Sequence, residues 1–276
     1  MTMKKLDFRT LVMLLCVASM TVFASCDNKG NEPEYPQGEQ TEQNGSTENN
    51  GGEETPEPET PTPTDPYNGH AYVDLGLSVK WATCNVGATK PEEYGNYYAW
   101  GETTPKTEYN WSTYKFMDSS VNDWNGLNRY TIADGQTDGV WYDSEGNFIG
   151  DNKTTLDKED DAATVNMGGS WRMPTNDELN ELKTECTWTW TYDYNDTGVA
   201  GQIVTSKTND NHIFLPSAGY RRDSDLRDGV SYGYYWLSSI NMSFSDYAGR
   251  LYFGSAYVDC GNKERYYGYS VRGVIE

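Results

Sequence analysis

The sequence predicts an α+β fold for residues 67–276, and three observations support this prediction. Only two segments, 157–166 and 176–186, carry the signals of a helix. The other segments read as short strands separated by Gly, Asn, Asp and Pro turns. No internal repeat of about 20 to 50 residues is visible. Two short helices embedded in many antiparallel strands are typical of the α+β class.

The first 25 residues predict an export signal. Lys4, Lys5 and Arg9 precede an apolar run over 11–24. A helix of that length spans about 21 Å, which is short of the roughly 30 Å hydrocarbon core of a membrane. The small residues at 24 and 25 followed by Cys26 resemble a bacterial lipobox, so we expect a lipoprotein signal peptide over 1–25 and acylation of Cys26. The alternative is ordinary signal cleavage nearby, with Cys26 as an incidental thiol.

Residues 26–66 are expected to be a disordered, acidic, proline-rich tether. Positions 27–66 hold 11 acidic side chains, one lysine and seven prolines, and Tyr35 is their only large apolar residue. A segment of this composition cannot form a core. Anchor and tether together predict a location on the outer membrane, exposed at the cell surface, with the lipid as the only membrane contact.

Charge and motif content exclude several functions. The net charge of −21 would repel nucleic acid. Only two histidines are present, His70 and His212, and HExxH, paired CxxC, GxSxG and phosphate-binding glycine loops are all missing. We therefore expect no enzyme activity, no cofactor and no metal, and a structural role for His212 at the start of a strand.

Three cysteines lie in the predicted domain, namely Cys84, Cys186 and Cys260. An odd count permits at most one bridge among them, and the sequence does not select a pair. A domain of this length can be stable without disulfides. The favoured expectation is that they are buried, unpaired thiols that act as small hydrophobic residues.

The two helices are predicted from their first turns. Thr175 and Glu178 form a capping box before the apolar pair Leu179 and Leu182, which predicts a helix over 176–186. A cluster of acids at 157 and 159–161 occupies the expected first turn of the helix over 157–166, where the helix dipole favours negative charge. A cation site is the alternative interpretation of that cluster.

The remaining elements are expected to be strands or irregular loops. Segment 103–150 is rich in turn residues and is expected to be irregular, held in place by Trp111, Trp124 and Trp141, with a hairpin turn at 143–147. The predicted strands are 187–192, 202–206, 213–215, 235–238, 250–253, 256–259 and 270–275.

Tyrosine is concentrated near the C-terminus, where residues 220–269 contain ten of the 22 tyrosines among Asp, Asn, Ser, Gly and Arg. This mixture is typical of binding loops, because Tyr offers rigid amphipathic contact. Tyr235 and Trp236 are assigned to the core, and the alternation around Leu251 and Phe253 places Arg250 on an outward face. The rings expected to face outward or line a groove are Tyr232, Tyr234, Tyr252, Tyr257, Tyr266, Tyr267 and Tyr269.

Six ordered motifs resemble the Fibrobacter succinogenes major paralogous domain family over about residues 70–276. They include DLGLSVKWATCNVGA at 74–88, GGSWRMPTNDEL at 168–179 and FLPSAGYR at 214–221, followed by a closing pattern that contains Arg265 and Arg272. This resemblance implies a C-type lectin-like fold, which the family shares with the formylglycine-generating enzyme and with retroelement-diversified variable proteins. It also implies that Trp171 and Pro174 pack the helix against the sheet, and that Arg172 and Arg272 are structural.

The same resemblance implies a ligand face on the variable C-terminal loops. The contact candidates there are Arg222, Asp225, Tyr232, Tyr234, Asn241, Asp246, Tyr257, Asp259, Asn262, Lys263, Tyr266 and Tyr267. The calcium-binding triplets of sugar-binding lectins are missing, and the catalytic cysteines of the formylglycine-generating enzyme are not recognisable. The expected function is an adhesin-like module that binds a protein or glycan. A structural pilus-tip or matrix subunit is the alternative, and an enzyme is a weaker one.

Overall fold

The computed structural model describes residues 66–121 and 123–276. The predicted signal peptide 1–25, the lipidation of Cys26 and the tether up to residue 65 lie outside the described residues. Within the part of the chain that is described, no helix is both long and apolar enough to cross a bilayer.

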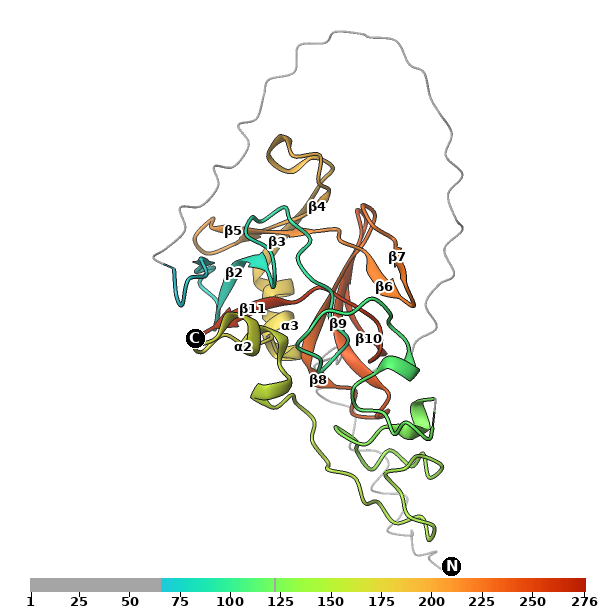
Figure 1. Ribbon diagram of the computed structural model, residues 1–276. Helices are drawn as coiled ribbons and strands as arrows, with labels where there is room; N and C mark the ends of the chain where they lie inside the picture. Colours follow the sequence, from blue (N-terminus) through green and yellow to red (C-terminus); the bar gives the residue numbers. More distant parts are fainter. Residues whose placement is uncertain (1–65, 122) are drawn as a thin grey trace, which may run out of the picture.

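The described chain has the expected α+β architecture, in which two short α-helices lie among small antiparallel sheets (Figure 1). The helices are α2 (Ala162–Met167) and α3 (Asn176–Glu185). The strands are β1 (Tyr72–Val73), β2 (Lys80–Asn85), β3 (Cys186–Thr191), β4 (Gly201–Ser206), β5 (His212–Pro216), β6 (Tyr220–Arg222), β7 (Asp225–Arg227), β8 (Gly233–Ile240), β9 (Tyr247–Phe253), β10 (Val258–Glu264) and β11 (Arg272–Ile275). The seven strands predicted from alternation are present. The lectin-like fold itself stays a prediction.

The strands form three three-stranded sheets, β1-β2-β11, β10-β9-β8 and β3-β4-β5, and the hairpin β6-β7. The sheet β10-β9-β8 separates two hydrophobic clusters. One face contributes Tyr235 and Leu251 to a cluster that includes α3, and the other contributes Tyr234 and Trp236 to a cluster with Tyr269. Because both faces are covered, this central sheet has no face that is wholly open to solvent.

Helix α3 begins as the sequence predicts, but α2 does not. The side chain of Thr175 accepts a hydrogen bond from the Glu178 amide, the reciprocal bond is also present, and Leu179 and Leu182 are buried. The other helix was expected from residue 157 but begins at Ala162, where Asp161 is the cap. Glu159 and Asp160 lie on a 3₁₀ turn, Lys158–Asp160, which Asp157 precedes as its cap, and Asp160 binds Lys115 and Arg129 from other segments.

The two arginines that the family resemblance implies to be structural, Arg172 and Arg272, each hold other parts of the chain in place. Arg172 forms a forked pair with Glu178, with N···O distances of 2.5 and 2.8 Å. Arg272 is fully buried and donates to the carbonyls of Ala82, Thr83 and Phe214. Each guanidinium acts as a planar forked donor that satisfies several acceptors at once.

The segment 103–150 is irregular, as expected. Trp111 and Trp124 each begin a 3₁₀ turn, and Trp141 is buried. The expected hairpin turn is present, because Tyr142 pairs with Phe148 and the Asp143 carboxylate accepts bonds from two amides of the turn.

Two of the cysteines are free thiols. Cys186 is buried beside α3, where burial raises the pKa of its thiol to about 11, and Cys84 is half-buried. Cys260 is not one of the free thiols, so the expectation of unpaired cysteines holds only for the other two.

His212 predicts a pH dependence of stability. It is buried at the start of β5, and burial lowers the pKa of its imidazole. Because the unfolded chain binds this proton more readily, the free energy of unfolding should fall as the pH drops below about 6.5, by at most about 1.4 kcal/mol per pH unit. Urea unfolding between pH 5.5 and 7.5 should show a smaller slope in His212→Asn than in the parent. Equal slopes in His212→Asn and the parent would contradict the assignment.

Candidate functional site

A row of half-buried tyrosine rings crosses the end of the sheet β10-β9-β8 and reaches the hairpin β6-β7. We call the rings of Tyr220, Tyr232, Tyr252 and Tyr257 the tyrosine face. The Tyr232 and Tyr257 centroids are 6.2 Å apart, and those of Tyr252 and Tyr257 are 5.7 Å apart. Buried Tyr234 connects the row, because its ring lies 5.2 Å from Tyr220 and 6.4 Å from Tyr232. These contacts hold the rings in one rigid arrangement.

The side chain of Arg250 packs behind this row, against the rings of Tyr252 and the buried Tyr234. It was expected to face outward but is only 3% exposed. Its guanidinium lies 4.6 Å from the Tyr252 centroid and 5.3 Å from that of Tyr234, and it donates to the Tyr269 hydroxyl at 3.0 Å. Contacts between a desolvated cation and aromatic faces are favourable, so Arg250 stabilises the positions of the Tyr234 and Tyr252 rings. Alternation correctly placed Arg250 and Tyr252 on the same face of β9, opposite Leu251 and Phe253. The error was to expect that face to be open to solvent at Arg250.

Two glycines allow the rings to lie close to the backbone. A Cβ atom on Gly254 would be 2.9 Å from the Tyr232 ring, and one on Gly261 would be 3.2 Å from the Tyr252 ring. Both glycines lie within the tyrosine-rich segment of the sequence. A glycine in a strand often marks a place where another group packs closely on the backbone, so these two are the sequence signal that the tyrosine rings lie against the sheet.

The hairpin β6-β7 presents the exposed polar candidates at one end of the tyrosine face. Arg222 and Asp225 are exposed on its two strands. Reciprocal backbone hydrogen bonds join Asp223 to Tyr109 and Arg221 to Gly268. The β6 side of the hairpin is thus bound to the body by two segments, which gives the hairpin a defined position.

Several contact candidates are buried, contrary to the expectation from the sequence. Tyr234, Tyr266 and Tyr267 are 8%, 8% and 5% exposed, and Tyr269, also expected outside, is 1% exposed. Tyr266 and Tyr267 stack on each other with centroids 4.6 Å apart, and Trp111 covers Tyr266. These rings form the interior that supports the face, so they are not available as contact residues.

Asn241 and Asp246 are also buried, in the turn between β8 and β9. The Asn241 amide oxygen accepts bonds from the Ser243 and Phe244 amides, so its role is to shape the turn. The neighbouring Ser245 donates to Asp134 from its amide and its hydroxyl, which joins this turn to the irregular segment. These two candidates belong to the scaffold.

The last three candidates lie on β10. Asp259 is exposed and pairs with Lys183 of α3 at 3.0 Å. Asn262 and Lys263 are half-buried, and the Lys263 ammonium lies 5.1 Å from the Tyr267 centroid. The structure therefore keeps five of the candidates at or beside the tyrosine face, namely Arg222, Asp225, Tyr232, Tyr257 and Asp259. Tyr220 is absent from the sequence expectations, whereas Tyr252 and Arg250 were expected to face outward but were not contact candidates.

No family model, curated protein or solved structure matches this chain. Membership of the major paralogous domain family therefore stays a prediction, and the proposed function depends on the geometry alone.

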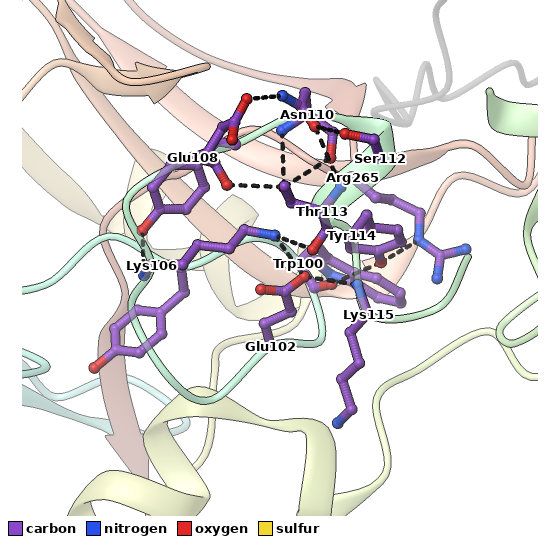
Figure 2. Close-up of polar contacts among 12 residues, drawn as sticks. Trp100, Glu102, Lys106, Glu108, Asn110, Ser112, Thr113, Tyr114, Lys115 and Arg265 are labelled. Atoms are coloured by element: carbon purple, nitrogen blue, oxygen red, sulfur yellow. Dashed lines mark hydrogen bonds and ion pairs between the residues drawn. The ribbon is translucent and has the colours of Figure 1, made fainter. Parts of the chain in front are cut away.

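A buried network around Arg265 holds the loop 100–115 beside this region (Figure 2). The Arg265 guanidinium is 0% exposed and donates from Nε to the Tyr114 hydroxyl at 2.9 Å. Nearby, Glu102 accepts from the Lys106 ammonium and from the Lys115 amide, at 2.8 and 2.9 Å. The same loop provides the Tyr109 strand pair that holds the hairpin β6-β7.

The acidic cluster proposed as a possible cation site is neutralised by protein side chains. Asp157, Glu159 and Asp160 place one oxygen each within 4.8 Å of one another. The Arg129 guanidinium binds all three, at 2.6, 3.1 and 2.9 Å, and Lys115 also binds Asp160 at 2.6 Å. Arg129 and Lys115 already supply positive charge to these carboxylates, so the cluster gives no support for a metal site.

Proposed function

We propose that this chain is a lipid-anchored surface module that binds a protein or glycan through the tyrosine face. The observation that supports this proposal most is the rigid row of half-buried rings, supported by Arg250 and bordered by the exposed Arg222 and Asp225. Partly exposed aromatic rings that are already ordered lose little conformational entropy on binding. The polar side chains at the border would orient the ligand.

The proposed surface is smaller than the sequence indicated. Because Tyr234, Tyr266 and Tyr267 belong to the interior, affinity must come from the rings of Tyr232, Tyr252 and Tyr257 and from the hairpin. Aromatic residues beside an Arg are a frequent composition of the central contacts in protein interfaces. A compact patch of this kind fits one sugar chain or one short protein segment better than a broad flat partner.

The enzymatic alternative receives little support. The buried carboxylate of Asp161 has a pKa that burial raises, which would suit an acid catalyst. However, its two oxygens accept bonds from the Thr164 and Met173 amides, so this side chain serves as a helix cap.

The test is the triple variant Tyr232→Ala, Tyr252→Ala, Tyr257→Ala in the full chain. Binding would be measured on a glycan array and on an array of extracellular host proteins. Any ligand found for the parent should lose about 30-fold or more in affinity, which corresponds to about 2 kcal/mol. The control is Tyr192→Ala, because Tyr192 is 75% exposed just after the end of β3. Unaltered binding by the triple variant would show that the tyrosine face is not the contact surface.

A further inference from the structure

A cavity of about 640 Å³ lies where the start of the described chain meets α2 and the end of β11. Residues of its wall include Tyr67, Thr155, Asp161, Ser238 and Ile275. Figure 1 shows α2 and the C-terminal end on the opposite side of the molecule from the hairpin β6-β7. The cavity is therefore separate from the tyrosine face, and its volume is within the range of about 300–1,000 Å³ that is typical of small-molecule sites.

The walls of the cavity are held by specific contacts. Asp161 caps α2 and also accepts a bond from the Met173 amide at 2.8 Å. The carbonyl of Tyr67 accepts a bond from the Trp171 indole at 3.1 Å, and its hydroxyl accepts one from the Ser170 amide at 3.1 Å. The first described residues thus form one rim of the cavity, and a helix cap forms another. A cavity with such walls keeps its shape without a ligand.

One buried hydroxyl in the wall has no hydrogen-bond partner among the described residues. Ser238 is 4% exposed, and its hydroxyl makes no hydrogen bond. Its backbone groups are both satisfied, because its amide donates to the Pro174 carbonyl and its carbonyl accepts from the Leu156 amide. An unsatisfied buried hydroxyl is unfavourable, so a ligand hydroxyl that reaches Ser238 would supply the missing partner.

The chemistry of the lining indicates what the ligand is. Hydroxyl side chains are frequent, namely Thr155, Thr164, Ser170, Thr175 and Ser238. They are interspersed with apolar groups from Leu156, Trp171, Met173 and Ile275. The charged residues of the lining are Lys158, Arg172, Asp161 and Glu276. Arg172 is paired with Glu178, and both oxygens of Asp161 accept bonds from backbone amides, so Lys158 and Glu276 remain as one charge of each sign. A lining of this kind has no preference for a charged ligand.

We propose that this cavity binds a neutral saccharide unit. The hydroxyl groups of a sugar match the hydroxyl-rich lining, and its C–H faces match the apolar groups between them. This site does not depend on the tyrosine face, so either site can be correct without the other.

The experiment uses the full chain and saturation-transfer NMR followed by calorimetry. The neutral probes are glucose, galactose, mannose, N-acetylglucosamine, maltose, cellobiose and lactose, and the anionic probes are glucuronic acid and sialic acid. At least one neutral probe should bind. Ser238→Ala should weaken that binding by about 3- to 10-fold, as expected for one hydrogen bond. Thr155→Phe should weaken it at least as much, because the added ring occupies part of the cavity.

Two control variants test whether the sugar binds in this cavity or elsewhere on the protein. Thr187→Phe places the same ring on an exposed position of β3 and should leave binding unchanged. The triple tyrosine variant should also bind the sugar normally, which distinguishes the cavity from the tyrosine face. Near-ultraviolet circular dichroism would verify that each variant is folded. The proposal is overturned if no neutral probe binds, if an anionic probe binds more tightly, or if Ser238→Ala and Thr155→Phe bind as well as the parent.

Discussion

Replacement of Arg265 by lysine is expected to lower the free energy of unfolding by about 3–5 kcal/mol. The guanidinium donates to the Tyr114 hydroxyl and to the carbonyls of Tyr130, Ser245 and Arg129, at 2.9 to 3.1 Å. A lysine ammonium has three donors and no planar fork, so it cannot satisfy these acceptors together. The carbonyls left behind are in a buried region, where an unpaired acceptor is costly.

Denaturant unfolding of the full chain measures this effect, and Arg227→Lys is the matched control. Arg227 lies on the exposed strand β7 and pairs with Asp225 at 3.4 Å, so its replacement should change stability by less than about 0.5 kcal/mol. Hydrogen exchange should rise in Arg265→Lys around 129–132 and 245, which are the segments joined by the guanidinium. Equal stability of the two variants would show that Arg265 does not hold these segments together.

The elements that the sequence predicts best are those set by neighbouring residues. The α3 capping box requires only Thr175 and Glu178, and Leu179 and Leu182 follow at helical spacing. Strand alternation also assigned Leu251 and Phe253 of β9 to the interior. These features depend on interactions over three or four residues, which are visible in any short window of sequence.

The errors arise where distant segments meet. Whether Arg250 is exposed depends on Tyr269 and Tyr234, which cover it from the closing segment and from β8. Tyr269 is itself held by its backbone pair with Tyr98. In the same way, Arg129 binds Asp157, Glu159 and Asp160, which lie about 30 residues further along the chain. Neither alternation nor charge density reveals such pairings.

The sequence indicates where the candidate site lies but not which residues form it. Tyrosine enrichment indicates the segment that carries the tyrosine face, since Tyr232 and Tyr257 belong to both. Tyrosine, however, serves both as a contact and as a buried ring with a satisfied hydroxyl. Tyr234 illustrates the second use, because its hydroxyl donates to Asp228 while its ring is buried. The proposed adhesin surface therefore depends on the half-buried rings and not on the whole tyrosine-rich segment.

Gly219→Ala is the second substitution with a large expected effect, at about 2–5 kcal/mol of unfolding free energy. Gly219 has φ of +63°, and a Cβ atom there would lie 2.1 Å from the Arg227 carbonyl oxygen and 2.6 Å from the Gly229 amide nitrogen. The left-handed conformation costs about 1–2 kcal/mol for alanine, and the clash with backbone adds about 1–3 kcal/mol. The control is Gly198→Ala, because Gly198 has φ of +74° and no atom of another described residue lies within 4 Å of its Cβ position.

The difference between these two variants isolates the clash, since both carry the same conformational penalty. Gly219 also donates its amide to the Tyr232 carbonyl at 2.8 Å, directly before the hairpin that carries Arg222 and Asp225. To accommodate the methyl group, the strand β7 must move away from β6 or the Tyr232 bond must break. Gly219→Ala should therefore weaken binding at the tyrosine face even below its melting temperature, whereas Gly198→Ala should not. If the two variants unfold at the same denaturant concentration, the close approach of the hairpin to Gly219 does not exist in solution.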